Sequence, residues 1–212
     1  MKLYDDPRSG NGYKARLLLA HLGLAYRYVP LDILRGETRT PDFLQKNLNG
    51  RIPVLELDDG TCLAESNAIL YYLSQGSPYW PTDRLAQSQV LQWLFFEQYS
   101  HEPNIATPRF WLVIKKLEMT PFNAELLAQK QKAGNQALAV MERHLGSRAF
   151  FVGERYSIAD IALYAYTHEA HEGGFDLSQY PLVTAWLARV RDQPRHVTID
   201  DWQQAAQVHR DR

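Results

Sequence analysis

The sequence predicts an α/β unit at the N-terminus followed by an all-helical unit. In the first 76 residues, short strand-like runs alternate with helix-like ones, whereas from about residue 84 long stretches keep the helical spacing of apolar residues. The segment between them contains Pro78 and Pro81, which can continue neither a helix nor the middle of a sheet. We therefore expect an α/β domain over residues 1–76, a linker over 77–83 and an all-α domain over 84–212.

The first domain is expected to have the element order β-α-β-α-β-β-α. Its first helix carries Ala15, Leu18 and Leu22 on one stripe and is stopped by Gly23. Strands are expected at Lys2–Asp5, Ala25–Leu31, Val54–Leu57 and Thr61–Ala64, and helices at Asn11–Leu22, from Pro41, and at Ser66–Ser74.

The second domain is expected to contain five helical stretches. Pro103 and Pro108 should break or kink what would otherwise be one long helix. Ser157, followed three residues later by Asp160, predicts a reciprocal helix cap. The stretches are Arg84–Ser100, Pro108–Leu117, Pro121–Leu145, Ser157–His171 and Pro181–Arg191.

The composition is that of an ordinary globular chain, with 45% hydrophobic and 22% charged residues. A formal net charge of -1, without any dense Lys/Arg run, gives no attraction to a polyanion, so we expect no nucleic-acid partner. No stretch reaches the ~18 apolar residues of a membrane span, and residues 1–7 lack the apolar core of a secretory signal. We therefore expect a cytoplasmic location and no membrane partner.

Cys62 is the only cysteine, which excludes an intrachain disulfide, a CxxC redox pair and a thiolate metal cluster. We expect no bound metal, and Cys62, on a strand expected to be buried, should be inert. Any thiol chemistry must therefore use a thiol brought from outside.

Three motifs in the first domain carry chemistry. Pro53 stands at the start of an expected strand. A cis bond before it would turn the N–H and C=O of Ile52 outward, where an extended peptide can pair with them. From Ile-Pro alone, the commoner arrangement is a trans proline at the start of an edge strand. Glu65 and Ser66 open a helix, where Ser66 and free N–H groups suit a carboxylate and Glu65 suits an ammonium; a plain cap is the alternative. Ser9 opens the first helix, where an anion would be stabilised, or is an ordinary serine cap.

Together with the proline-bearing linker and the Ser157 to Asp160 cap, these motifs make the chain resemble the cytosolic glutathione S-transferase family over nearly its whole length. The resemblance is to bacterial, serine-type members of theta or zeta character, with some features of the nu type. It implies a thioredoxin-like first domain and glutathione as the co-substrate.

The resemblance also implies roles for individual residues. Ile52 beside a cis Pro53 would hold the cysteinyl backbone of glutathione, and Glu65 and Ser66 its γ-glutamyl end. The glycine carboxylate needs a cation, for which Arg51, Arg39 and Arg35 are candidates. Arg51 ranks first because it is adjacent to Ile52.

Two side chains compete for the role of donor to the sulfur. Ser9 matches the serine of theta-like, delta and zeta members, whereas Asn11 resembles the nu-type pattern of disulfide or peroxide reduction, and the choice between them stays open. Tyr4, on the preceding strand, is the poorer candidate.

The electrophile is expected between the two domains. For Phe110 and Trp111, core packing is the somewhat favoured alternative. The candidate residues are Tyr99, His101, Asn104, Arg109, Phe110 and Trp111.

The expected function is that of an enzyme that conjugates glutathione to small electrophiles in detoxification. The alternatives are a glutathione-dependent disulfide reductase or peroxidase, acting on a disulfide or peroxide, and a non-catalytic glutathione-binding interaction module. By resemblance, a cytoplasmic homodimer is expected.

Overall fold

A computed structural model describes residues 1–202. Its chain divides into two compact units: Met1–Ser77 with the described residues from Pro194 onward, and Pro78–Gln193. The first is α/β and the second is helical, which confirms the predicted fold class. The exact domain bounds of the sequence analysis remain a prediction.

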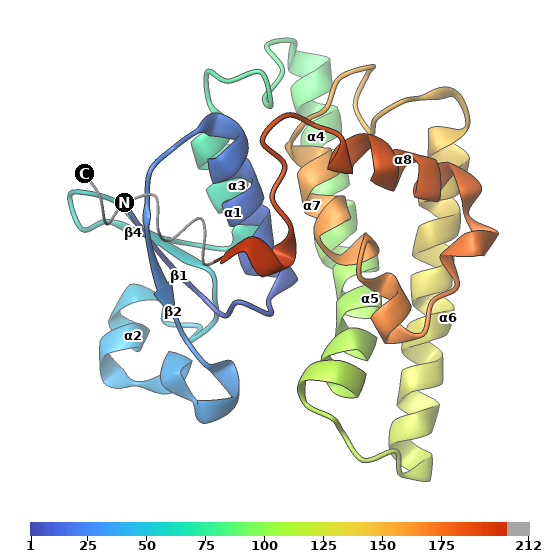
Figure 1. Cartoon of the computed structure of the whole chain (residues 1–212), viewed down its shortest axis with the longest axis horizontal. Coiled ribbons are helices and arrows are strands. Elements are labelled where there is room, and N and C mark those ends of the chain that lie inside the picture. Colours follow the sequence, from blue (N-terminus) through green and yellow to red (C-terminus); the bar gives the residue numbers. More distant parts are fainter. Residues whose placement is uncertain (203–212) are drawn as a thin grey trace. The chain divides into compact units, whose positions relative to one another are not determined.

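As far as the structure describes it, the first unit is a four-stranded sheet with three α-helices, in the predicted order β-α-β-α-β-β-α. Helices α1 and α3 lie side by side on one side of the sheet, and α2 lies on the other (Figure 1). Two short 3-10 helices, Ile33–Arg35 and Glu37–Arg39, precede α2. The elements are β1 (Lys2–Asp5), α1 (Gly10–Leu22), β2 (Arg27–Pro30), α2 (Pro41–Lys46), β3 (Val54–Glu56), β4 (Cys62–Ala64) and α3 (Ser66–Ser74).

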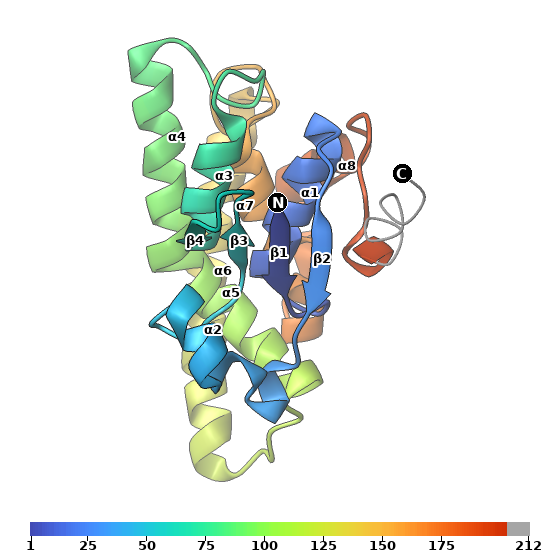
Figure 2. The same ribbon diagram turned by 90° about the vertical axis from the view of Figure 1, so that its left-hand side faces the viewer.

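The sheet has the strand order β2-β1-β3-β4 (Figure 2). Strand β1 is parallel to β2 and antiparallel to β3, with Leu3 opposite Leu55, and β3 forms a hairpin with β4. The core on the helix side contains Leu17, Leu18 and Ile69, none of which is exposed. The carboxyl end of β1 leads directly into the loop before α1, which carries Ser9.

Glu56 on β3 ties three elements together. Its carboxylate accepts hydrogen bonds from Lys2 Nζ at 2.6 Å, Tyr4 OH at 2.8 Å and Lys46 Nζ at 2.8 Å. The Tyr4 hydroxyl, the poorer candidate for the sulfur donor, is thus committed to Glu56.

The segment after residue 193 packs on α1. Tyr13 OH donates to the Val197 carbonyl at 2.7 Å, Arg16 Nη1 donates to Ile199 O at 2.7 Å, and His21 Nδ1 lies 2.8 Å from Pro194 O. Residues 84–212 were all expected in the helical domain, but these contacts group the described part of this segment with the first unit. The part beyond residue 202 lies outside the described residues.

The second unit is built from five α-helices and short irregular turns among the described residues. Apolar residues of α4, α6, α7 and α8 form its core, and every residue of α7 is buried. The helices are α4 (Arg84–Phe96), α5 (Glu102–Arg109), α6 (Pro121–His144), α7 (Ile158–Thr167) and α8 (Pro181–Arg191), and the 3-10 helices are Leu145–Ser147, Ala170–Gly173 and Leu177–Gln179.

Of the break or kink expected at Pro103 and Pro108, the break is absent, and the kink remains a prediction. Helical backbone continues from α4 through α5, with π-helical turns at Glu97–His101 and Phe110–Ile114. In the first of them, the Glu102 N–H donates to the Glu97 carbonyl, one residue further back than in an α-helix. Such a wider turn accommodates the missing N–H of the adjacent proline without ending the helix.

The predicted cap at the start of α7 is present. Asp160 accepts hydrogen bonds from the Ser157 N–H at 3.0 Å and the Ser157 hydroxyl at 3.2 Å, and Ser157 Oγ accepts from the Ala159 N–H. The same carboxylate also accepts from the Phe151 N–H and from Trp186 Nε1, each at 3.0 Å. Asp160 is therefore a structural hub of the second unit.

Glu56→Gln should flatten the acid dependence of stability. The hydrogen bonds from Lys2, Lys46 and Tyr4 lower the pKa of Glu56 from 4.5 to about 2. Because this pKa is lower in the folded chain, its stabilisation is complete above about pH 4.5 and is lost as the pH falls towards 2. Between pH 2 and 5, the free energy of unfolding in urea should change by about 1–2 kcal/mol less in Glu56→Gln than in the wild type. If the free energy of unfolding of Glu56→Gln varied with pH as much as that of the exposed control Glu118→Gln, the stabilising role of ionised Glu56 would be contradicted.

Candidate functional site

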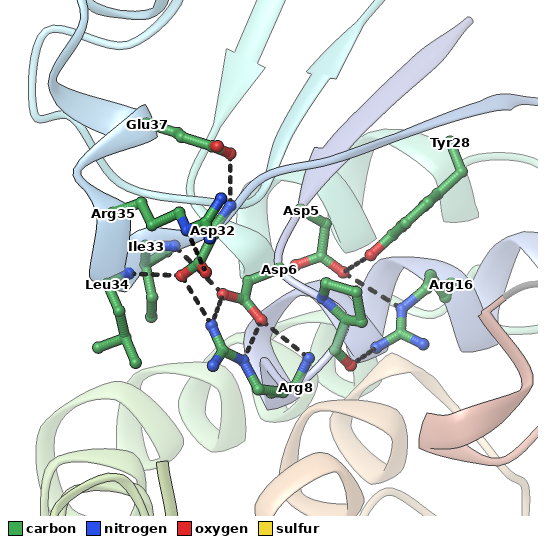
Figure 3. Close-up of polar contacts among 11 residues, drawn as sticks. Asp5, Asp6, Arg8, Arg16, Tyr28, Asp32, Ile33, Leu34, Arg35 and Glu37 are labelled. Carbon is green, nitrogen blue, oxygen red and sulfur yellow. Dashed lines mark hydrogen bonds and ion pairs between the residues drawn. The ribbon is translucent and has the colours of Figure 1, made fainter. Parts of the chain in front are cut away.

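The loop between β1 and α1 is held by Arg8. Its Nε and Nη2 donate to both oxygens of Asp6, at 2.8 and 2.6 Å, and Nη2 also reaches Asp32 Oδ1 at 3.1 Å (Figure 3). Burial opposes ionisation of Asp6, but the hydrogen bonds from Arg8 outweigh it and lower the pKa of Asp6. These contacts fix the residues that immediately precede Ser9.

The 3-10 segment after β2 is tied to the same loop. Asp32 Oδ1 accepts from the Leu34 N–H at 2.8 Å, and Glu37 Oε2 accepts from the Asp32 N–H at 2.7 Å (Figure 3). Between loop and segment lies a surface hollow of about 350 Å³. It is lined by Asp6, Pro7, Arg8, Pro30, Leu31, Asp32 and Glu37.

Beneath the loop, Asp5 and Arg16 form a buried ion pair. Arg16 Nε lies 3.2 Å from Asp5 Oδ2, and Tyr28 OH donates to the same carboxylate at 3.4 Å (Figure 3). Burial raises the pKa of Asp5 to about 7, against the opposing charge of Arg16. Arg16 Nη2 also donates to the Pro7 carbonyl at 3.0 Å, so the pair supports the loop from below.

Ser9 caps α1. Its Oγ accepts from the Gly12 N–H at 3.2 Å, with extended backbone at Ser9. No group among the described residues accepts the hydroxyl hydrogen of Ser9. Ser9 therefore offers an O–H donor at the positive end of α1, next to the N–H groups of its first turn.

Asn11 and Ser66, which are 55 residues apart in sequence, are in contact. Ser66 Oγ donates to Asn11 Oδ1 at 3.1 Å. Lys14 Nζ lies 2.9 Å from Asn11 Oδ1 and 3.2 Å from Ser66 Oγ. The N-terminal turn of α1 and that of α3 are thereby joined, so two of the predicted motifs form one site.

The bond between Ile52 and Pro53 is cis, as the family resemblance implies. Pro53 is buried and Ile52 is half-buried, directly before β3. The backbone of Ile52 thus lies at the start of the strand that pairs with β1.

Glu65 precedes α3 in an unusual conformation. Its φ of 68° lies in the left-handed region, which is uncommon for a residue other than glycine. Such a conformation costs on the order of 1–3 kcal/mol, and outliers of this kind concentrate at functional turns. The Glu65 side chain is exposed, whereas Ser66 is buried.

The three candidate arginines differ in their contacts. Arg39 Nη1 donates to the Asn49 carbonyl at 3.0 Å, and Arg35 lies 3.9 Å from Asp32. The exposed guanidinium of Arg51 has no hydrogen-bond or ion-pair partner among residues 1–202. Arg51 is therefore the most available of the three cations.

The residues predicted for the electrophile do not form a single polar cluster within the second unit. His101 is buried with Nε2 2.8 Å from Thr167 Oγ1, and Arg109 Nε donates to Glu172 at 2.6 Å. Asn104 Nδ2 donates to the Ser100 carbonyl at 2.8 Å. Tyr99 is 87% exposed, and the half-buried Phe110 and Trp111 open the second π-helical turn. Their predicted role remains a prediction.

Other potential sites are weak. Glu169, His171 and Glu172 place ligand atoms within 4.8 Å of one another, but Arg109 already pairs with Glu172 and lies 4.0 Å from Glu169. Cys62 is half-buried rather than buried, and its pKa is raised by partial burial, so it is a poor nucleophile. Among the described residues, no helix is long and apolar enough to cross a membrane.

Sequence reasoning missed the buried cations of α1. Lys14 and Arg16 flank its apolar stripe, and 10 of the 13 residues of α1 are buried. The run Leu17 to Leu19 directly after Arg16 was a sign that this helix is buried on most sides. A helix buried in this way needs an internal partner for each of its charges. Arg8 gave no comparable signal, since its carboxylate partners lie in two separate segments.

Gly12→Ala should destabilise the chain strongly. A Cβ at Gly12 would lie only 1.6 Å from Asp5 Oδ1, so the buried carboxyl group would have to move. We expect a loss of roughly 3 kcal/mol in urea unfolding, although Gly to Ala in a helix is otherwise favourable. The control Gly146→Ala, where a Cβ meets nothing within 4 Å, should change stability by less than about 1 kcal/mol. Equal effects would refute this packing.

Comparisons with family models cover most of the chain. Residues 1–75 match the N-terminal domain of glutathione S-transferase, and residues 94–194 match its C-terminal domain. These matches assign the first unit to the thioredoxin-like domain of that family.

Solved structures agree with this assignment. A glutathione S-transferase from Pseudomonas fluorescens is 56% identical, covers 93% of this chain and 98% of its own, and superimposes with a TM-score of 0.91. Ure2p in complex with glutathione is 26% identical, over 92% of this chain and 90% of its own, with a TM-score of 0.80.

Curated relatives include elongation factor 1-gamma from Danio rerio, which is 34% identical over 93% of this chain but only 45% of its own length. The chain spans less than half the length of that relative. The chain matches both domain models and is 56% identical to a solved transferase along almost the full length of both chains. It therefore belongs to the glutathione S-transferase family.

Proposed function

We propose that the chain binds glutathione on its first unit, stabilises the thiolate with Ser9 and conjugates it to small electrophiles. The observation that carries this is the 3.1 Å contact between Ser66 Oγ and Asn11 Oδ1. Two motifs meet at this contact. One is expected to bind the thiol of the tripeptide and the other its γ-glutamyl end. Support for the ligand comes from the family and from the glutathione held by the related Ure2p.

The peptide would be held by groups that are suited to each of its parts. The backbone of Ile52 offers an N–H and a C=O to the cysteinyl residue. The carboxylate of Glu65 suits the γ-glutamyl ammonium, and Ser66 with the N-terminal N–H groups of α3 suits its carboxylate. Arg51, whose guanidinium has no partner among residues 1–202, would hold the glycine carboxylate.

Ser9 is favoured over Asn11 as donor to the sulfur. The Ser9 oxygen already accepts from Gly12, which leaves its hydrogen to donate. A free thiol of this type has a pKa near 8.5, so only a few per cent is thiolate at pH 7. A hydroxyl bonded to the charged form and the positive end of α1 both lower that pKa, and each unit corresponds to about 1.4 kcal/mol.

The reaction then needs no oxidant or metal. The thiolate attacks an electrophilic carbon and forms a C–S bond, while the electron pair goes to a leaving group or to the opened double bond or ring. The proton released from the thiol goes to solvent. Ser9 keeps its own proton throughout, because it acts as donor and not as nucleophile.

A second function, reduction of disulfides or peroxides, is favoured by the position of Asn11. Its amide lies in the first turn of α1 and its oxygen is fixed by Lys14 and Ser66. In this reaction the thiolate attacks a disulfide sulfur or a peroxide oxygen, and the S–S or O–O bond breaks with a thiolate or an alkoxide as the leaving group. A second glutathione thiolate then attacks the mixed disulfide or the glutathione sulfenic acid and displaces the second thiolate or hydroxide, which forms glutathione disulfide. Two glutathione molecules thus supply both electrons.

A non-catalytic module is the third function. The 34% identity to elongation factor 1-gamma shows that the matching region also occurs within longer proteins with that name. Glutathione affinity without turnover of any electrophile, disulfide or peroxide would favour this role. A cytoplasmic role in detoxification, by contrast, is part of the transferase proposal and rests on the family resemblance alone.

A homodimer is proposed from the same resemblance and from an exposed apolar stripe. Leu91, Phe95 and Tyr99 follow one another at four-residue spacing and are 36%, 70% and 87% exposed. Contiguous apolar side chains on one helix face are characteristic of interaction surfaces. A second copy of the chain is the occupant we propose for this stripe.

Loss of the Ser9 hydroxyl should impair catalysis more than binding. Removing one hydrogen bond to a charged sulfur should raise the pKa of the bound thiol and lower kcat roughly 10- to 100-fold, with little change in KM for glutathione. The measurement is the ultraviolet absorbance of the thiolate against pH, together with turnover of an aryl halide. Ser9→Ala also weakens the cap of α1, so Ser9→Gly, which costs a cap only a few tenths of a kcal/mol, serves as control. A larger effect of Asn11→Ala than of Ser9→Gly would move the donor role to Asn11.

Rates with three model substrates should separate the two chemistries. We expect wild-type turnover of an aryl halide to exceed that of a hydroperoxide and of a small disulfide. Faster turnover of the hydroperoxide and the disulfide than of the aryl halide would reject conjugation as the main activity. If that turnover were lost in Asn11→Ala and kept in Ser9→Gly, it would establish the reductase.

Phe95→Asp should dissociate the proposed dimer, because it places a charge in the apolar stripe. Sedimentation velocity should show a dimer for the wild type and a monomer for this variant. Phe122→Asp, at an equally exposed phenylalanine on α6 (68% against 70%), should leave the dimer intact. A monomeric wild type would disprove the proposal.

A further inference from the structure

Lys14 is a buried lysine at the centre of the proposed glutathione site. Its side chain is fully buried, and lysine is almost never fully buried without polar partners. Two of those partners are Asn11 Oδ1 at 2.9 Å and Ser66 Oγ at 3.2 Å. Since Ser66 also bonds Asn11 at 3.1 Å, the three polar groups form a closed triangle across α1 and α3.

The triangle fixes the orientation of the Asn11 amide. A lysine amine is a donor without acceptor capacity in its charged form, so the atom of Asn11 beside it must be the carbonyl oxygen. A flipped amide would place two donors against each other. The amide N–H₂ of Asn11 is thereby directed away from Lys14 and Ser66.

The triangle also orients the Ser66 hydroxyl. Ser66 Oγ accepts from Lys14 and gives its hydrogen to Asn11. A carboxylate arriving at the start of α3 would compete with Asn11 for that hydrogen. The Asn11 oxygen would then retain Lys14 as its donor, so the amide would stay oriented in the occupied site.

We propose that Lys14 is a positioning residue for two parts of the ligand. It acts through Asn11 beside the thiol, where the Asn11 amide supplements the hydrogen bond from Ser9, and through Ser66 at the γ-glutamyl carboxylate. This role rests on the glutathione binding proposed above. Lys14 Nζ contacts both Asn11 Oδ1 and Ser66 Oγ, the two groups that would face the thiolate and the γ-glutamyl carboxylate of the proposed ligand. Lys14 lies within the first-helix motif of the sequence, but the sequence alone gave it no role in the site.

The test compares four variants of the whole chain. Lys14→Met keeps an unbranched side chain that is one atom shorter and removes the donor, whereas Lys14→Arg keeps charge and donors. Lys14→Gln keeps a donor without charge. Lys132→Met, at an exposed lysine of α6, is the matched control.

Two quantities are measured for each variant. The pKa of bound glutathione is obtained from thiolate absorbance, and the affinity for S-methylglutathione, which has no thiol to ionise, from equilibrium dialysis. In Lys14→Met we expect the pKa of the bound glutathione thiol to rise by about one unit, which is a tenfold change in its acid dissociation constant. We also expect the affinity for S-methylglutathione to fall about tenfold. Lys14→Arg should restore part of both, Lys14→Gln should lie between, and Lys132→Met should behave as the wild type.

Double-mutant cycles distinguish positioning from a plain charge effect. If Lys14 acts through Asn11, Lys14→Met should not raise the thiol pKa further in an Asn11→Ala background. If it acts through Ser66, it should not weaken S-methylglutathione further in a Ser66→Ala background. Full additivity in both cycles, or equal effects of Lys14→Gln and Lys14→Met, would overturn the positioning role.

Failure of this inference is distinguishable from failure of the proposed function. A wild type that does not bind glutathione rejects the proposed function before any variant is compared. A wild type that binds and ionises glutathione, with Lys14→Met unchanged in both quantities, rejects only the role of Lys14. If circular dichroism shows that Lys14→Met is unfolded, the same cycles are carried out with Lys14→Gln, for which additivity is again the overturning result.

Discussion

The close approach of α1 to the end of β1 is the constraint on which the site depends. Gly12 leaves room for the Asp5 carboxyl group, and Arg16 neutralises that group from the same helix. Arg16 also donates to the carbonyls of Pro7 and Ile199. One buried guanidinium therefore joins the strand end, the loop that carries Ser9 and the segment after residue 193. Any change that separates α1 from β1 would displace Ser9 and Asn11 together.

Local sequence signals predicted much of the first unit. Gly23 ends α1 in the left-handed conformation, Thr40 caps α2 with Pro41 at its first turn, and α3 spans Ser66–Ser74 as expected. Each of these signals depends on the backbone requirements of a few adjacent residues. The Ser157 to Asp160 cap of the second unit was predictable for the same reason.

Features that depend on distant residues were not predictable in this way. The contact of Lys14 with Ser66 joins residues 52 positions apart, and the contact of Arg8 with Asp32 joins residues 24 apart. The π-helical turns on either side of α5, which keep the helix continuous past Pro103 and Pro108, have no signal in the local sequence. The segment after residue 193 has few apolar residues. Its hydrogen bonds to Tyr13, Arg16 and His21, and the ring contact of Trp202 with Tyr28, group it with the first unit. For the electrophile, the sequence offered aromatic and polar candidates but no geometry that unites them.

Binding of an external thiol tripeptide is the central claim, and calorimetric titration of the intact chain with reduced glutathione tests it most directly. The account predicts saturable heat with one ligand per chain, weakened when Arg51 or Glu65 is replaced by alanine. A folded chain that shows no saturable heat over millimolar glutathione would contradict it.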